Sequence, residues 1–140
     1  MRDSAIRLRT IITITVLAGA GEFLGGLLLV LAPAWTLSLM KAPAVHEPVF
    51  VGFIGCFVSG VGLSYLWGLA AWSFTGSLQR LRTAWEITII FRILAGSFVL
   101  FHVIRGTLAS PWLSVPLTDW LWVIVQALLI HANAFGAPDR

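Results

Sequence analysis

Four apolar stretches, each long enough to cross a lipid bilayer, occupy most of this 140-residue chain: residues 8–34, 49–72, 84–105 and 117–134. The hydrocarbon core of a bilayer is about 30 Å thick, and a helix needs roughly 20 apolar residues to cross it. Lipid offers no hydrogen bonds to a bare backbone, so each stretch has to be helical. We therefore predict an all-α protein, an up-down four-helix transmembrane bundle that forms a single domain over residues 1–140.

The composition supports a membrane protein and argues against a soluble one. Hydrophobic residues make up 59% of the chain and charged residues 11%, whereas soluble domains carry about 25% charged residues. The net charge of +3 comes largely from basic residues at the ends of the stretches, so we expect the lipid bilayer and no nucleic acid as a partner. Cys56 is the single cysteine, which excludes an internal disulfide.

Basic residues around the stretches are unevenly distributed between the two predicted sides. One side carries Arg2, Arg7, Arg9, Arg80, Arg82 and Arg140, and the other carries Lys41 and Arg105. Loops rich in Lys and Arg stay in the cytoplasm. We therefore predict a multi-pass protein of the cell inner membrane with both termini cytoplasmic. The first stretch also has features of a signal peptide, but its apolar pattern continues through Leu31, so we expect an uncleaved span.

Polar residues inside the stretches are the strongest candidates for a site. Glu22, Arg92 and Gln126 each lie near the middle of a different stretch. A charge at this depth costs about 2.5–3.5 kcal/mol on insertion scales, so it needs a partner or a role. Small residues one turn away from Glu22 and Arg92 indicate that both side chains face the bundle interior. We predict a Glu22–Arg92 ion pair with hydrogen-bonding neighbours among Gln126, Ser59, Ser64 and Tyr65.

Two interpretations of this cluster stay open at the level of sequence. In the first, the ion pair is structural and fixes the register of the helices, since buried ion pairs specify geometry more than they stabilise. In the second, the cluster lines a polar pocket for a head group, a quinone or a proton. Nearer the predicted cytoplasmic end, Arg82 and Glu86 are four residues apart, and we expect a local ion pair there.

A second cluster of polar residues is predicted at the outward-facing surface of the membrane. It comprises His46, Glu47, His102, Arg105 and Asp119. Two histidines and two carboxylates are possible metal ligands, and two histidines can ligate haem iron. However, the sequence has no helical histidine pair at ligand spacing and no tight His/Cys cluster. We therefore expect no metal, and we interpret these residues as interfacial side chains, with Asp119 capping a helix and pairing with Arg105.

Small residues recur at the spacing of close helix contacts. The second stretch has Gly52, Cys56, Gly60 and Ser64, and the first has Gly21 and Gly25 with Gly26. Because lipid provides little hydrophobic force between helices, small residues that let backbones approach are the main means of association. We expect most of them to pack this bundle, with the alternative that one such face docks a partner subunit.

Three segments carry a resemblance to a known family. They are GAGEFLGGLLLVLAP at residues 19–33, GFIGCFVSGVGLSYL at residues 52–66 and FRILAG at residues 91–96. In hydropathy and glycine pattern the chain resembles small bacterial four-span membrane proteins of the DoxX/DoxD-like group. The resemblance implies a four-helix bundle and, in some members, association with quinone-linked sulfur oxidation or other redox partners. It carries over no catalytic residue, and the single Cys56 departs from relatives that use cysteine pairs.

No sequence motif identifies a reaction. The chain has no phosphate-binding loop, no H-E-x-x-H and no G-x-S-x-G. We therefore expect a non-catalytic accessory or scaffold subunit, or a helper of a membrane redox complex, that contacts other membrane subunits or itself and needs no cofactor. The alternative is a small redox protein, or one acting on lipid or quinone, with an intramembrane pocket. An oligomeric transporter or channel is the second alternative.

Overall fold

The computed structural model describes residues 2–43 and 47–136, and all regular secondary structure in these ranges is helical. Four long helices, α1 (Arg2–Leu31), α3 (Pro48–Thr75), α4 (Leu78–Ile104) and α5 (Ser114–His131), follow the four predicted stretches. The short helix α2 (Pro33–Leu39) lies between α1 and α3, and the 3-10 helix η1 (Ser110–Leu113) precedes α5. The prediction of an all-α four-helix bundle is therefore confirmed.

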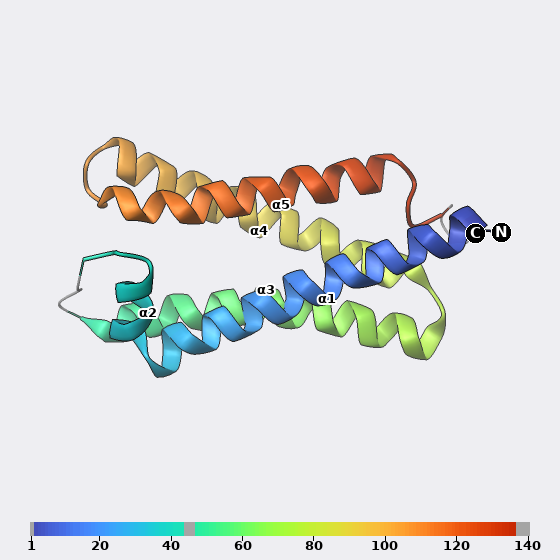
Figure 1. Cartoon of the computed structure of the whole chain (residues 1–140), viewed down its shortest axis with the longest axis horizontal. Helices are drawn as coiled ribbons and strands as arrows, with labels where there is room; N and C mark the ends of the chain where they lie inside the picture. The colour runs from blue at the N-terminus through green and yellow to red at the C-terminus, as the bar shows by residue number, and fades with distance from the viewer. Residues whose placement is uncertain (1, 44–46, 137–140) are drawn as a thin grey trace.

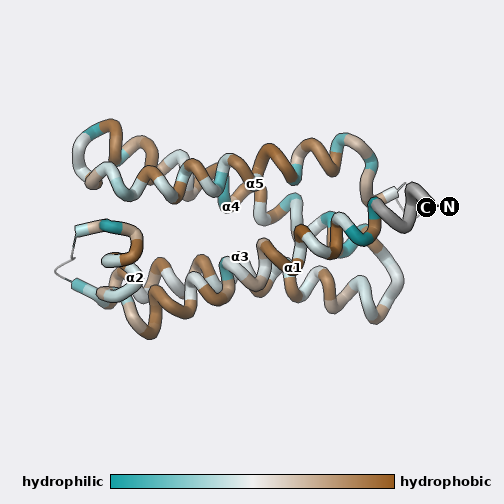
Figure 2. The backbone as a smooth tube through the Cα atoms, in the orientation of Figure 1, coloured by the Kyte–Doolittle hydropathy of each residue, from teal (hydrophilic) through white to brown (hydrophobic). Residues whose placement is uncertain are grey.

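The surface of the bundle is suited to lipid. Each of the four long helices has the length and apolar composition of a membrane span. Large apolar side chains point outward along all of them, for example Phe57, Leu94 and Leu121, each about 60% exposed. Figure 2 shows hydrophobic residues along most of each long helix, with hydrophilic residues concentrated near the helix ends. An apolar surface of this extent requires a lipid environment, so the chain is a multi-pass membrane protein.

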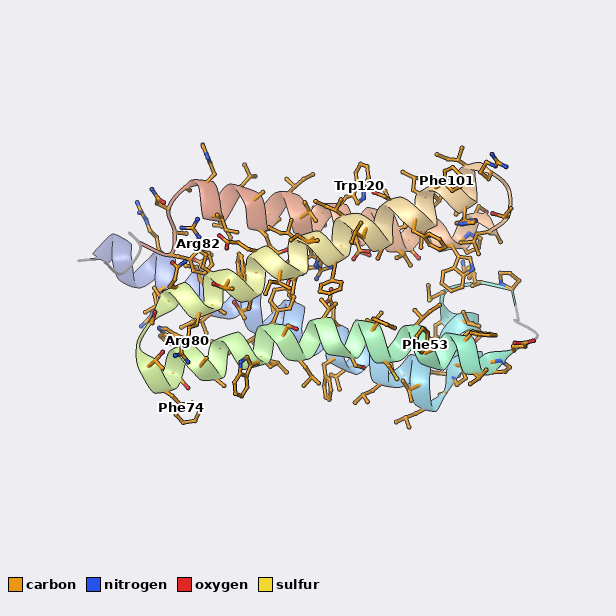
Figure 3. All side chains as sticks on the ribbon, turned by 180° about the vertical axis from the view of Figure 1, so that it is seen from behind. Phe53, Phe74, Arg80, Arg82, Phe101 and Trp120 are labelled. Carbon is orange, nitrogen blue, oxygen red and sulfur yellow. The ribbon has the colours of Figure 1, made fainter. Side chains whose placement is uncertain are left out.

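The four long helices form two pairs (Figure 1): α1 packs along α3, and α4 packs along α5. Helix α3 also contacts α4, whereas α1 has no close backbone contact with α4 or α5 within the described residues. Helix α1 begins and α5 ends at the end of the bundle where α3 connects to α4, and α2 lies at the opposite end. Figure 3 places Arg80 and Arg82 near that connection, while Phe53 and Phe101 lie toward the other end.

Glycines allow α1 and α3 to approach one another closely. A Cβ atom placed on Gly26 would lie 2.5 Å from the Gly55 carbonyl oxygen, and one placed on Gly62 would lie 2.7 Å from the Gly19 carbonyl oxygen. Only hydrogen fits in such a space, which is the arrangement expected of helices that associate in lipid. At the far end of α3, Gly76 adopts a positive φ of 71° and its N–H bonds to the Trp72 carbonyl, which ends the helix.

Prolines mark two other helix boundaries. Pro33 occupies the first turn of α2, so the first span ends at Leu31 and a separate short helix follows it. Helix α5 begins at Ser114, three residues before the predicted start at residue 117, with Pro116 in its first turn. The earlier start is permitted because proline lacks only an N–H that the first turn of a helix leaves unbonded.

We predict that Gly26→Ala destabilises the bundle. The added methyl group would meet the backbone of Gly55 and Ser59, which cannot move aside as a flexible side chain can. Overpacking of this kind costs about 1–3 kcal/mol, measured as a lower unfolding midpoint of the purified protein in detergent. Gly21→Ala, on the same helix with nothing within 4 Å of its Cβ position, is the matched control and should keep the wild-type midpoint. Equal midpoints for both variants would contradict the assigned packing.

Candidate intramembrane polar site

Arg92 is the centre of a polar cluster between the two helix pairs. It lies on α4 and is only 3% exposed. Its Nη2 pairs with Glu22 Oε1 from α1, and its Nη1 donates to Asp119 Oδ1 from α5 at 3.0 Å. Its Nε donates to the Tyr65 hydroxyl from α3 at 3.3 Å. One guanidinium therefore contacts all three other long helices.

The helical period of α4 explains why Arg92 reaches this position. The residues that α4 buries are Leu81, Trp85, Thr88, Arg92 and Gly96, which are three or four apart and so share one face. Gly96 lies against Trp120, where a Cβ atom would come within 2.9 Å of the indole nitrogen. This close approach of α5 to α4 brings Asp119 to Arg92.

Gln126 and Thr88 extend the cluster by hydrogen bonds. The Gln126 Nε2 donates to the Tyr65 hydroxyl at 2.6 Å and to the Thr88 hydroxyl at 3.2 Å. Thr88 in turn donates to the Trp85 carbonyl on its own helix at 2.9 Å. Tyr65 therefore joins the charged part of the cluster to a neutral part, and α3, α4 and α5 all contribute to it.

A second polar contact joins α1 to α4 directly. The Trp85 indole Nε1 donates to the Thr15 hydroxyl at 3.1 Å, and both side chains are fully buried. The indole ring also packs edge-to-face against Phe135, with the ring centroids 5.1 Å apart. This contact was not predicted from the sequence, although the seven-residue spacing of Thr15 and Glu22 places the two side chains on one face of α1.

The cluster is buried at Arg92 and partly exposed at its two carboxylates, and its hydrogen bonding is incomplete. The side chains of Glu22 and Asp119 are 18% and 16% exposed, and Arg92 lies 5.8 Å from the ring centroids of both Tyr65 and Trp122. Three buried side-chain atoms in the cluster have no hydrogen-bond partner: Glu22 Oε2, Gln126 Oε1 and Arg92 Nη2, the last of which is in ion-pair contact with Glu22. Buried polar atoms are nearly always paired, so these atoms are exceptions.

The structure confirms part of the predicted intramembrane cluster. Glu22 and Arg92 form the predicted ion pair, and Tyr65 and Gln126 are hydrogen-bonding neighbours as expected. Ser59 and Ser64 were wrongly included in this group. Ser59 donates to the Phe23 carbonyl of α1 at 3.3 Å, and Ser64 to the Gly60 carbonyl of its own helix at 2.9 Å. Hydroxyls within helices commonly bond nearby carbonyls in this way.

Asp119 does not belong to the outer-surface group in which it was predicted. It neither pairs with Arg105 nor caps a helix; it lies inside α5, which begins five residues earlier, and bonds to Arg92. The signal for this contact was present in the sequence. Asp119 and Gln126 are seven residues apart and so share one face of α5.

The other residues of the predicted outer-surface group do not converge on a site. His102 Nδ1 lies 2.7 Å from the Thr107 hydroxyl, and Arg105 lies over the Phe101 ring. Glu47 precedes α3, and His46 lies outside the described residues. Within residues 2–43 and 47–136, no three His, Cys, Asp or Glu side chains are grouped so that they could hold a metal ion.

An open pocket of about 500 Å³ lies apart from Arg92, where α4 and the C-terminal end of α5 face each other. Its polar lining includes Arg82, Glu86 and His131. The predicted Arg82–Glu86 ion pair is confirmed, with 2.8 Å between Nε and Oε1. Since these two charges neutralise each other, the pocket presents little net charge to a ligand.

Comparison with known proteins adds no identification. No protein-family model matches the chain, and no curated protein or solved structure matches it significantly. The interpretation of the cluster therefore depends on its geometry.

We predict that Arg92→Gln strongly destabilises the protein. It would leave Glu22 and Asp119 buried near each other without a positive charge. Removal of one partner from a buried ion pair costs about 3–5 kcal/mol. The measurement is the unfolding midpoint of the purified protein when SDS is titrated into mild-detergent micelles. Arg105→Gln, which removes an exposed guanidinium from the end of the same helix, is the control. An unchanged midpoint for Arg92→Gln would contradict a structural role for the cluster.

Proposed function

We propose that this membrane protein is a non-catalytic accessory or scaffold subunit, or a helper of a membrane redox complex. The observation that carries the proposal is that Arg92 is sealed. Its Nε and Nη1 donate to Tyr65 and Asp119, its Nη2 is in ion-pair contact with Glu22, and the residue is 3% exposed. A residue that binds a substrate has to offer a free donor to it, whereas a residue that joins helices does not.

Unfilled small-residue positions on the outside of the bundle support lateral contact with another membrane protein. Gly21, Gly25 and Gly60 have nothing within 4 Å of their Cβ positions, in contrast to Gly26, Gly55 and Gly62 between α1 and α3. Exposed glycines on a membrane helix leave its backbone open to a neighbouring helix. The partner is either another membrane subunit or a second copy of this chain.

A second candidate function is that of a small membrane protein acting on a quinone or a lipid. The unpartnered Glu22 Oε2 and Gln126 Oε1 favour it, since a bound polar group could donate to them. Quinone would then be the cofactor. This candidate agrees with membership of the DoxX/DoxD-like group, which we retain as a proposal that rests on the glycine and hydropathy pattern of the sequence.

We also propose that both termini face the cytoplasm of a bacterial cell, with the chain in the inner membrane. Arg80 and Arg82 lie at the end of the bundle where α1 begins and α5 ends (Figure 3). Basic residues concentrate on the cytoplasmic side of bacterial membrane proteins. The connection between α4 and α5 would then face outward.

Cysteine accessibility tests this orientation. In a Cys56→Ser background, we expect a membrane-impermeant maleimide added to intact cells to label the Ala109→Cys variant. The Ser73→Cys variant, at the opposite end of the bundle, should be labelled only after lysis. Both positions are exposed, so the difference reports sidedness. Labelling of Ser73→Cys alone in intact cells would mean that the orientation is inverted.

Native purification tests the accessory role. We expect the full chain, extracted from its own membranes in mild detergent, to carry a membrane-protein partner in a fixed ratio, as determined by mass spectrometry. Gly60→Leu should release most of that partner because the new side chain fills an open helix face. Leu63→Ile is the control, since it alters an exposed position of the same helix without enlarging the side chain.

Two results would contradict the accessory role. One is a chain that purifies without any protein partner but with a quinone or lipid in a near-equal ratio, which would support the second candidate. The other is a partner that Gly60→Leu and Gly25→Leu both retain, which would mean that the open glycine faces are not the contact.

A further inference from the structure

The charges of the cluster do not balance. Glu22 on α1 and Asp119 on α5 both pair with the single guanidinium of Arg92 on α4. The group that α3 contributes is the Tyr65 phenol, which is neutral when protonated, and Gln126 and Thr88 are uncharged. The remaining ion pair of the described residues, Arg82–Glu86, has no net charge. Its nearer member in sequence, Glu86, lies six residues before Arg92 on α4. With both carboxylates ionised, the cluster would carry one unbalanced negative charge.

An unbalanced charge at this location is unfavourable. The four helices are surrounded by lipid, which supplies no counter-ion, and isolated ions are costly to bury. Three buried side-chain atoms of the cluster lack a hydrogen-bond partner: Arg92 Nη2, which is in ion-pair contact with Glu22 Oε1, and the two oxygens Glu22 Oε2 and Gln126 Oε1. Gln126 is 1% exposed. The cluster therefore lacks a positive charge, and its two unpartnered oxygens lack a hydrogen-bond donor. A proton supplies both.

We propose that the cluster is a proton-binding site and that Glu22 holds the proton on Oε2, so that Glu22 is a neutral carboxylic acid in the folded protein. Glu22 Oε1 still accepts from Arg92, while the full ion pair is the one between Arg92 and Asp119. Glu22 is the carrier because its second oxygen is buried without a partner, whereas no oxygen of Asp119 is. The proton comes from water and returns to water when Glu22 ionises, and no other bond changes.

This inference goes beyond the proposed accessory role and does not depend on it. The proton lies between the two helix pairs, since Glu22 belongs to one pair and Arg92 and Asp119 to the other. Loss of the proton would place the unbalanced negative charge at that junction. The proton thus controls how firmly the two pairs hold together.

Infrared spectroscopy of the purified full-length protein in lipid vesicles tests the site directly. A protonated carboxyl absorbs above the amide band, and exposed carboxylates, being ionised at neutral pH, do not. We expect a carboxylic-acid band at neutral pH that diminishes as the pH is raised. Glu22→Gln, the neutral isostere of the protonated side chain, should lose the band and retain the wild-type unfolding midpoint. Glu86→Gln, at the exposed Arg82 pair, is the control and should keep the band.

Isotope labelling makes the test independent of whether the variants fold. Carbon-13 in the glutamate carboxyls of the wild-type protein should shift the band, and the same label in aspartate should leave it unchanged. Absence of the band at neutral pH overturns the proposal, as does a band that shifts only with labelled aspartate. A wild-type chain whose unfolding midpoint depends on sodium at fixed pH, without a carboxylic-acid band, would identify a cation in place of the proton. Partner binding by Glu22→Gln is a separate measurement, so failure of the accessory role leaves this result unaffected.

Discussion

The contact of Arg92 with two carboxylates joins α1 and α5 to α4 and so links the two helix pairs. Backbone proximity joins α1 to α3, α3 to α4 and α4 to α5, but α1 does not closely approach α4 or α5 within the described residues. Helices whose backbones do not approach each other are connected by side chains: Glu22 on Arg92 and Trp85 on Thr15 between α1 and α4, and Gln126 on Tyr65 between α3 and α5. In lipid, such bonds matter because apolar contact alone gives helices little reason to associate.

The bundle thus uses two kinds of interface for two purposes. The α1–α3 interface is made of glycines in backbone contact, with no room for any other residue. The interface between the pairs combines a close α3–α4 contact at Gly68 and Ala84 with polar side chains that connect the helices lying further apart. The first depends on shape and tolerates few substitutions. The second depends on charge and hydrogen bonding and is sensitive to the protonation of its members.

The fold was predictable from sequence because a bilayer leaves few options for long apolar stretches, and the pairing of Glu22 with Arg92 followed from their similar depth. The contact between Asp119 and Arg92 was missed because Asp119 was assigned to the surface, when α5 begins earlier than residue 117. Ser59 and Ser64 were included wrongly because depth alone does not determine the direction of a side chain. Small residues at Gly21 and Gly26 are only a few positions apart in sequence, yet one is open and the other is packed against α3. Spacing indicates a close contact, but it does not identify which glycine makes it.

The separation of the acid and the base along the chain has a consequence for biogenesis. Glu22 and the glycines of α1 and α3 belong to the first half of the sequence, and Arg92 belongs to the second. The first hairpin can therefore close while the ribosome is still making α4. During that interval Glu22 enters the membrane before Arg92 has been synthesised. The nascent hairpin therefore carries a carboxyl group in the membrane whose partner is present only in the finished protein.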